Sequence, residues 1–134
     1  MAELILELVT PERRILSEAA DEVIVPGVNG LFGVRLGHAP LLSVMQPGIL
    51  TYRVGTVSKS YFISGGFARV AENKVLVLAD QAEAVTDIDV SAAEERLQQA
   101  EEKLKGMSAD DVRFETESAT VRRETARMAA ATRR

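Results

Sequence analysis

The chain of 134 residues has no cysteine, no tryptophan and one histidine. Without cysteine it has no disulfide, no thiolate zinc site and no cysteine nucleophile. One imidazole without thiolate neighbours is also a poor basis for a transition-metal site. Because aromatic residues make up only 4% of the sequence, the core has to be built from aliphatic side chains. We therefore predict neither a metal nor a cofactor for this chain.

Surplus positive charge and long apolar runs are lacking as well. Sixteen basic residues stand against twenty acidic ones, for a net charge of −4. A nucleic-acid binder usually needs a basic surplus to displace counterions from phosphates. No apolar run approaches the roughly 20 residues that span a bilayer, and the first residues do not resemble a signal peptide. We expect no nucleic-acid partner, and membrane contact only through other proteins.

Glycine and proline are distributed unevenly along the chain. Eight of the nine glycines and all four prolines precede residue 68, whereas the stretch from residue 88 to the end has no proline and only Gly106. Such a change in composition marks a boundary between segments of different structure. We predict an α+β protein, with an all-β sandwich or barrel over residues 1–87 and a two-helix antiparallel hairpin over residues 88–134.

The first segment has the pattern of many short strands. Apolar residues alternate or cluster in runs of about seven residues, and turn-forming residues separate the runs. This regular spacing is typical of a β-sandwich or barrel. The predicted strands are 4–9, 21–27, 31–36, 48–54, 58–64, 66–71 and 74–80.

The second segment has helical periodicity. Ser91 and Glu94 have the spacing of a capping box, which predicts a helix start, and Gly106 is a plausible end. A second helix is expected from about Ala109 to Met128, with Ser108 and two aspartates at its start. Apolar residues of the first helix recur at spacings of four, three and four, at Ala93, Leu97, Ala100 and Leu104.

Large apolar residues are sparse in this hairpin, and alanines fill many of the remaining apolar positions. An alanine buries far less area than a leucine, so two such helices cannot build a deep core alone. We expect the hairpin to pack against the β-domain, against a partner, or to alternate between the two.

The stretch "VPGVNGLFGVRLGHAPLL" combines four glycines with the histidine, His38, and so raises the possibility of a catalytic loop. Its glycines do not have the G-x-G-x-x-G spacing, no helix is predicted after them, and no Gly-Lys-Ser/Thr occurs. We interpret His38 as part of a bend, hydrogen-bonded to nearby backbone. The open alternative is an enzyme that uses His38 with Asp80 or Glu83 as an acid and base.

The residues resemble those of a known family, the epsilon subunits of F-type ATP synthases, from about Leu4 to Leu104. The resemblance rests on "VIVPGVNGLFGVRLGHAPLLSVMQPGIL" and on "YFISGGFARVAENKVLVLADQAEAVTDIDVSAAEERL", in the family's order and spacing. It implies a β-sandwich with a C-terminal helical hairpin, and a non-catalytic subunit of the central stalk. The implied location is peripheral, at the cytoplasmic face of a bacterial inner membrane or at the equivalent organelle membrane.

The resemblance also implies partners. These are the gamma subunit, the ring of c subunits and, through an extended helical arm that restrains ATP hydrolysis, the catalytic beta and the alpha subunits. An acidic loop of the beta subunits would meet the basic second helix and tail. The expected partner-binding residues are Leu31, Phe32, His38, Arg113, Arg122, Arg123 and Arg127, with Arg133 and Arg134 adding to the basic tail.

Some members of the family bind ATP at an Ile/Leu-Asp-x-x-Arg-Ala motif. The corresponding residues here are Ile88, Asp89, Ala92 and Ala93, and Ala92 cannot supply the guanidinium group that grips phosphate. We therefore predict weak or absent ATP binding and expect Asp89 to help cap the helix. The alternative function is a nucleotide-sensing module that binds ATP on the hairpin.

Overall fold

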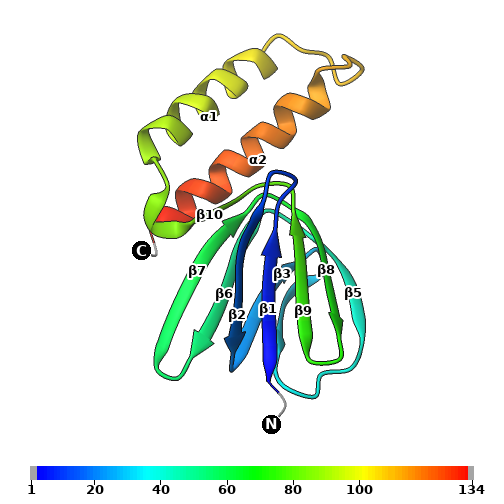
Figure 1. The fold of residues 1–134 in the computed structure, drawn as a ribbon. Coiled ribbons are helices and arrows are strands. Elements are labelled where there is room, and N and C mark those ends of the chain that lie inside the picture. The colour runs from blue at the N-terminus through cyan, green and yellow to red at the C-terminus, as the bar shows by residue number, and fades with distance from the viewer. Residues whose placement is uncertain (1–2, 133–134) are drawn as a thin grey trace. The chain divides into compact units, whose positions relative to one another are not determined.

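The computed structural model describes residues 3–132, and the chain divides after Ala84 into two compact units. The first unit holds the strands and the second holds the helices, as Figure 1 shows. The division lies three residues before the boundary expected from the sequence, because Val85–Asp87 forms a short 3₁₀ helix that groups with the helical unit.

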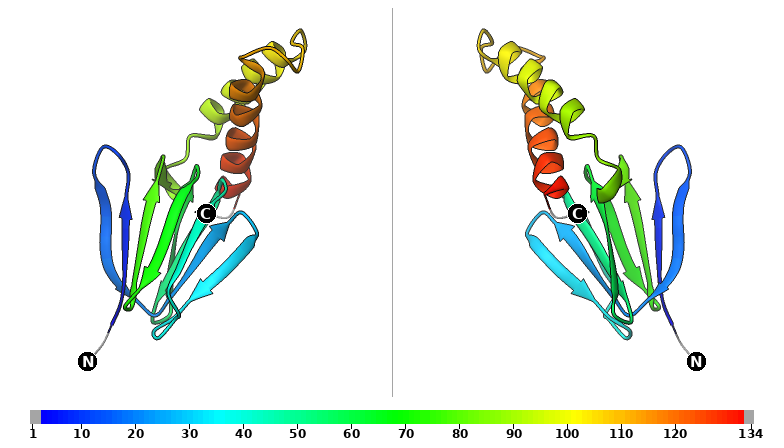
Figure 2. Two further views of the ribbon diagram at one scale, coloured as in Figure 1. Left: turned by 90° about the vertical axis from the view of Figure 1, so that its right-hand side faces the viewer. Right: turned by 90° about the vertical axis from the view of Figure 1, so that its left-hand side faces the viewer.

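The strands of the first unit form a single hydrogen-bonded network in the order β10-β7-β6-β3-β5-β8-β9-β1-β2, with β4 paired to β3. Neighbouring strands are antiparallel, except that β1 runs parallel to β9. Figure 2 shows this network from two opposite sides. The strands are β1 (Leu4–Val9), β2 (Arg14–Ala20), β3 (Glu22–Gly27), β4 (Gly30–Val34), β5 (Leu41–Met45), β6 (Gly48–Val54), β7 (Val57–Ile63), β8 (Gly66–Ala71), β9 (Lys74–Ala79) and β10 (Ala82–Ala84).

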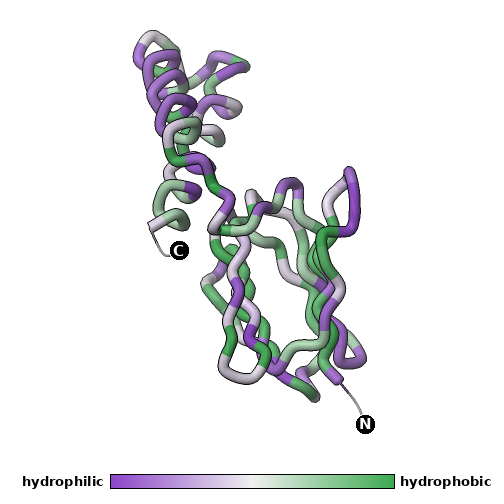
Figure 3. The backbone as a smooth tube through the Cα atoms, turned by 60° about the vertical axis from the view of Figure 1, so that its left-hand side comes forward, coloured by the Kyte–Doolittle hydropathy of each residue, from purple (hydrophilic) through white to green (hydrophobic). Residues whose placement is uncertain are grey.

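The core of this unit is aliphatic and follows the two-residue period of the strands. In β1, every second residue is buried, because successive side chains point to opposite faces of a strand. Figure 3 colours the backbone by hydropathy, and green apolar stretches recur along the strands of this unit. The fully buried members include Leu6, Leu8, Val23, Val25, Val34, Leu50, Ile63, Val75 and Val77.

Three strands were not predicted from the sequence. β2 contains Ser17, Glu18 and Ala19, which have little strand propensity and are exposed, and its pairing with β1 determines its conformation. β5 follows the His38 bend and pairs with β8, and β10 is a three-residue strand beside β7. Each is specified by pairing with another strand rather than by its own pattern, across a short connection for β2 and between strands distant in sequence for β5 and β10.

The second unit contains α1 (Val90–Leu104) and α2 (Phe114–Ala131), which pack side by side as the predicted antiparallel hairpin. The Asp89 carboxylate accepts a hydrogen bond from the Ala92 amide at 3.1 Å, so Asp89 is the N-cap and the predicted Ser91 capping box is wrong. The second helix begins at Phe114 rather than near residue 109. The aspartates expected at its start belong to the preceding turn, where Ser108 accepts from the Asp110 amide and Asp111 from the Arg113 amide.

The predicted apolar stripe of α1 faces inward. Ala93 and Ala100 are buried, while Leu97 and Leu104 are half-buried. On α2 the buried residues include Ala130 but also the charged pair Glu124 and Arg127. The hairpin thus has little large apolar surface, as its composition predicts.

Candidate interaction surfaces

The loop around His38 turns the chain by means of its own backbone. Gly37 has a φ of +85°, a conformation that favours glycine, and its amide donates to the Asn73 side chain at 2.7 Å. The His38 amide donates to the Arg35 carbonyl at 3.1 Å. Its ring Nδ1 lies 2.6 Å from the Ala39 carbonyl oxygen, which accepts the hydrogen bond. His38 is therefore bonded to nearby backbone, as the sequence suggested.

The structure separates His38 from the acidic residues considered as its catalytic partners. The Gly37–Asn73 bond holds the loop at the start of β9, whereas Asp80 follows the end of β9, where its amide donates to Gly65. A strand of six residues spans about 20 Å. Glu83 lies in β10, which pairs with β7 rather than with any strand of this loop. The enzyme alternative based on this histidine has no supporting geometry.

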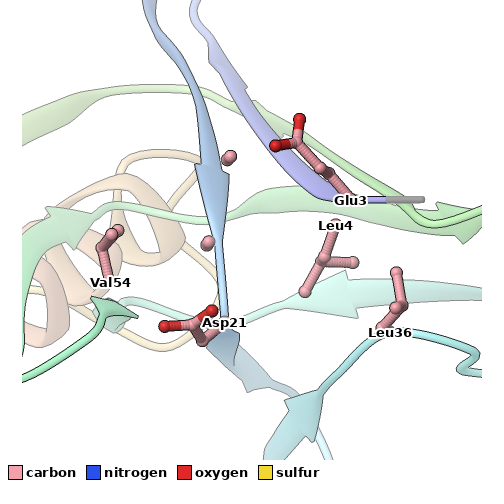
Figure 4. A pocket seen from close by; sticks show the side chains of 7 residues that line it. Glu3, Leu4, Asp21, Leu36 and Val54 are labelled. Carbon is pink, nitrogen blue, oxygen red and sulfur yellow. The ribbon is translucent and has the colours of Figure 1, made fainter. Parts of the chain in front are cut away.

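A pocket of about 340 Å³ lies in the β-unit and is shown in Figure 4. Its polar side chains are the carboxylates of Glu3 and Asp21, set among Leu4, Leu36, Val54 and two alanines. Asp21 is already engaged, because it accepts from the Gly55 amide at 2.6 Å and lies 3.6 Å from Arg53. None of the residues that line this pocket is a serine, threonine, cysteine, lysine or histidine.

Large apolar side chains are exposed at the β3–β4 turn, where Val28 is 49% exposed. Leu31 is 69% exposed, whereas Phe32 packs on the edge of the core beside Gly27. The Val28 amide donates to the Val44 carbonyl at 3.0 Å, which brings the turn to the end of β5. Of the two candidates in this turn, Leu31 alone is available as a large exposed contact.

Apolar side chains also form an exposed row across three adjacent strands. In the register of the sheet, Val44 of β5 lies beside Phe67 of β8, and Phe67 lies beside Leu78 of β9. Each of the three is about half exposed, and Leu42, two residues before Val44 on the same face of β5, is 69% exposed. We call Leu42, Val44, Phe67 and Leu78 the apolar face. A contiguous exposed apolar patch of this kind is typical of a protein interface.

The basic residues predicted on the second helix are largely paired with acidic ones. Arg113 binds the Asp111 carboxylate through its Nη2 at 3.1 Å, and this hydrogen bond lowers the pKa of Asp111. Arg122 binds the exposed Glu115 at 2.8 Å. Arg123 and Arg127 both bind Glu124. Arg133 and Arg134 lie outside the described residues.

Glu124 is the feature of this helix that the sequence analysis missed. Its side chain is only 1% exposed, and it is surrounded by guanidinium groups from both helices, those of Arg123 and Arg127 on α2 and that of Arg96 on α1. The four-residue set is called the Glu124 cluster below. The spacing of Glu124 and Arg127, three residues apart, is ordinary for a surface ion pair, so only the position of α1 reveals its burial.

The residues at the nucleotide motif have structural roles in this chain. Ile88 and Ala93 are buried, and Asp89 caps α1 by accepting from the Ala92 amide. Position 92 has no side chain that could bind phosphate.

The sequence comparisons bear on both units. Residues 3–85 match the model of the ATP synthase delta/epsilon chain beta-sandwich domain, and residues 86–132 match that of the delta/epsilon chain long alpha-helix domain. The chain belongs to the ATP synthase delta/epsilon chain family. The family resemblance and the predicted fold class are thereby confirmed.

Curated relatives match the chain over nearly its whole length. The ATP synthase epsilon chain of Myxococcus xanthus is 60% identical, covering 98% of this chain and 96% of the relative. That of Anaeromyxobacter sp. (strain Fw109-5) is 48% identical, covering 97% and 98%. An epsilon chain is one subunit of the ATP synthase complex, and we find no helix within residues 3–132 that is long and apolar enough to cross a membrane.

Solved structures agree with this assignment. A chain in the Euglena gracilis mitochondrial ATP synthase, in an assembly of OSCP, F1 and c-ring, aligns with a TM-score of 0.82 at 27% identity. The alignment covers 97% of this chain and 82% of that one. A chain in the central stalk and c-ring assembly of Tetrahymena thermophila ATP synthase has the same fold, with a TM-score of 0.66 at 19% identity.

Proposed function

We propose that this chain is a non-catalytic rotor subunit of an F-type ATP synthase, located in the central stalk and peripheral to the membrane. The observation that carries the proposal is the match of both units, in order and over nearly the full length, to epsilon chains. In a bacterium the subunit would lie at the cytoplasmic face of the inner membrane. Its role is to couple rotation of the c-ring to ATP synthesis without an active site of its own.

The apolar face is the proposed docking surface for the gamma subunit. Its four large side chains lie in register on adjacent strands, so a partner can bury them together. His38 precedes β5, whose Leu42 and Val44 belong to this face, so the loop would lie at its edge.

The β3–β4 turn is the proposed contact with the c-subunit ring. Leu31 projects from the turn with 69% of its surface exposed, which fits a contact that closes only in the complex. Phe32 would then act indirectly, because its ring packs against the core beside Gly27 and anchors the start of β4.

The hairpin is the proposed regulatory arm. It buries alanines and charged groups instead of large apolar residues, so the free-energy difference between its folded and extended arrangements is expected to be small. In the extended arrangement, the arginines of α2 would meet acidic residues of the catalytic beta and the alpha subunits and restrain ATP hydrolysis.

Steady-state ATP hydrolysis tests the regulatory part. The complex is reconstituted with residues 1–134 or with residues 1–87. We expect a several-fold faster rate with the shorter chain, because the arm is missing. Equal rates would assign the function to the β-unit alone, through assembly and coupling.

A pair of substitutions tests the docking surface. Phe67→Glu places a charge in the apolar face, whereas Val57→Glu places one at an equally exposed valine on β7. We expect Phe67→Glu to reduce the affinity for isolated gamma subunit at least about tenfold and Val57→Glu to leave it unchanged. Equal affinities for both variants would exclude the apolar face as the gamma interface.

A further inference from the structure

The Glu124 cluster places a carboxylate inside the hairpin. Charged side chains are rarely buried unless they are paired, and Glu124 uses both oxygens. Its Oε1 lies 2.5 Å from the Nη1 of Arg127, and its Oε2 lies 3.1 Å from the Nε of Arg123. The Nη1 of Arg96 is 3.7 Å from the same Oε1.

The three arginines do not have the same position in the hairpin. Arg123 and Arg127 are on α2 with Glu124, whereas Arg96 is on α1. The carboxylate therefore joins the two helices through Arg96 and compensates two positive charges of its own helix. The other ion pair described between the helices, Lys103 with Glu117 at 3.9 Å, involves a lysine that is well exposed.

The burial of this carboxylate makes it important for the closed hairpin. The Arg127 side chain is itself only 9% exposed, so removing the carboxylate would take a bound counter-charge from a nearly buried guanidinium group, and would also remove the ion pair with Arg96 across the helices. Loss of one partner of a buried ion pair is strongly destabilising, because the remaining charge stays desolvated. The neighbouring alanines supply little apolar surface to offset such a loss.

We infer that Glu124 is a charge latch that holds the hairpin closed and withholds Arg123 and Arg127 from acidic partners. In the closed hairpin both arginines are bound to a buried carboxylate. After opening, the pairs within α2 are exposed to water, where they contribute little, and an acidic segment can compete for both arginines. Closure of the hairpin and binding of an acidic segment thus require the same two arginine side chains. The regulatory consequence rests on the arm function proposed above.

The absence of native cysteine permits a direct distance measurement on the full chain. Spin labels at Gln98→Cys in α1 and Thr125→Cys in α2, both exposed positions, report the separation of the helices. We expect one short distance for the unmodified hairpin. Glu124→Gln should raise the ratio of open to closed hairpin by about tenfold or more.

The matched control is Glu115→Gln. Glu115 is also a glutamate on α2 bound to an arginine, but it is 78% exposed, so its loss should leave the distance distribution unchanged. Arg96→Gln should open the hairpin partially. Combined with Glu124→Gln, it should add less than the sum of the two single effects, because both remove the same contact.

A local folding defect is distinguished by the amide spectrum of the β-unit, which should be unchanged in every variant. A short distance in Glu124→Gln, equal to that of the unmodified chain, would overturn the latch. Opening by Glu115→Gln to the same extent would also overturn it, since any charge change would then suffice.

ATP hydrolysis by the complex separates the latch from the arm function. Glu124→Gln should slow hydrolysis several-fold if an opened arm restrains the enzyme. If the isolated chain opens while the rate is unchanged, the latch is supported and the restraining function of the arm is contradicted. If the isolated chain stays closed, the latch fails whatever the rate.

Discussion

The two units of this protein differ in what they bury. The β-unit encloses large aliphatic side chains such as Leu6, Leu8 and Leu50, all fully buried. The hairpin encloses alanines and an ionic cluster around Glu124. Burial of a leucine stabilises by about 1.5–3 kcal/mol, whereas an alanine removes far less apolar area from water. The difference indicates a β-unit that is stable by itself and a hairpin whose closed form is marginal.

This difference matches the two roles proposed for the subunit, docking by the β-unit and regulation by the hairpin. Docking to the rotor needs a rigid surface, which the paired strands β5, β8 and β9 provide. Regulation needs an element with two arrangements of similar free energy, which a thinly packed hairpin provides.

The largest expected effect is that of a core truncation in the β-unit. Leu8→Ala leaves a cavity in the packed sandwich and should lower its unfolding free energy by about 3–5 kcal/mol. Leu97→Ala removes a half-buried leucine from the hairpin and should cost only about 1 kcal/mol. Urea unfolding of the full chain measures both, with separate spectroscopic probes for strand and helix. Equal losses would contradict the contrast.

The second-largest difference in stability between the units is expected from glycine substitutions. A Cβ at Gly66 would lie 2.1 Å from the Leu78 carbonyl oxygen, at a φ of +131°, so Gly66→Ala should destabilise the β-unit by about 2–4 kcal/mol. Gly106, after α1, has open space around it, and Gly106→Ala should change stability by less than about 1 kcal/mol. Thermal unfolding measures the pair. A tolerated alanine at position 66 would show that β8 and β9 can separate there.

A smaller effect is expected at alkaline pH and only in the β-unit. Burial raises the pKa of Tyr52 above its ordinary value, and the hydrogen bond that its hydroxyl donates to Glu18, at 2.7 Å, adds to the shift. Because the pKa of Tyr52 is raised in the folded state, its contribution to the free energy of unfolding is complete below about pH 10. That contribution is lost as the pH rises above this value.

The matching variant is Tyr52→Phe. It should cost about 1 kcal/mol at neutral pH and lessen the decline of stability above about pH 10. Urea unfolding between pH 7 and 11 measures the effect. An unchanged alkaline decline in Tyr52→Phe would assign it to other groups.

The smallest expected effect is that of ATP on the hairpin. Ala92 supplies no guanidinium group, while Arg122 and Arg123 are paired with glutamates. A titration of the full chain to millimolar ATP should therefore produce no saturable shift in the amide signals of α1 or α2. A saturable shift there would contradict the prediction and support a nucleotide-sensing function.

The sequence predicted the strands whose own patterns are strong. β1, β6 and β8 were predicted with the bounds that the structure shows, because apolar residues alternate along them. β2 was missed because Ser17, Glu18 and Ala19 have no such pattern, and its conformation depends on pairing with β1. Local pattern therefore identified these strands, whereas β2, β5 and β10 are recognised only from their pairing with neighbouring strands.

The same limit applies to the interaction surfaces. Leu31 and Phe32 could be selected from the sequence, but only the structure shows that the first is exposed and the second packed. The apolar face was not predicted, because it requires the register between β5, β8 and β9. The Glu124 cluster depends likewise on the position of Arg96 across the hairpin.

The most direct test of the contrast between the units is hydrogen exchange of the full chain under native conditions. We predict that amides of α1 and α2 exchange at least about 100-fold faster than those of β1, β6 and β9, through opening of the hairpin while the strands remain folded. Exchange of helices and strands with the same protection and the same dependence on denaturant would contradict the account, because the two units would then unfold together.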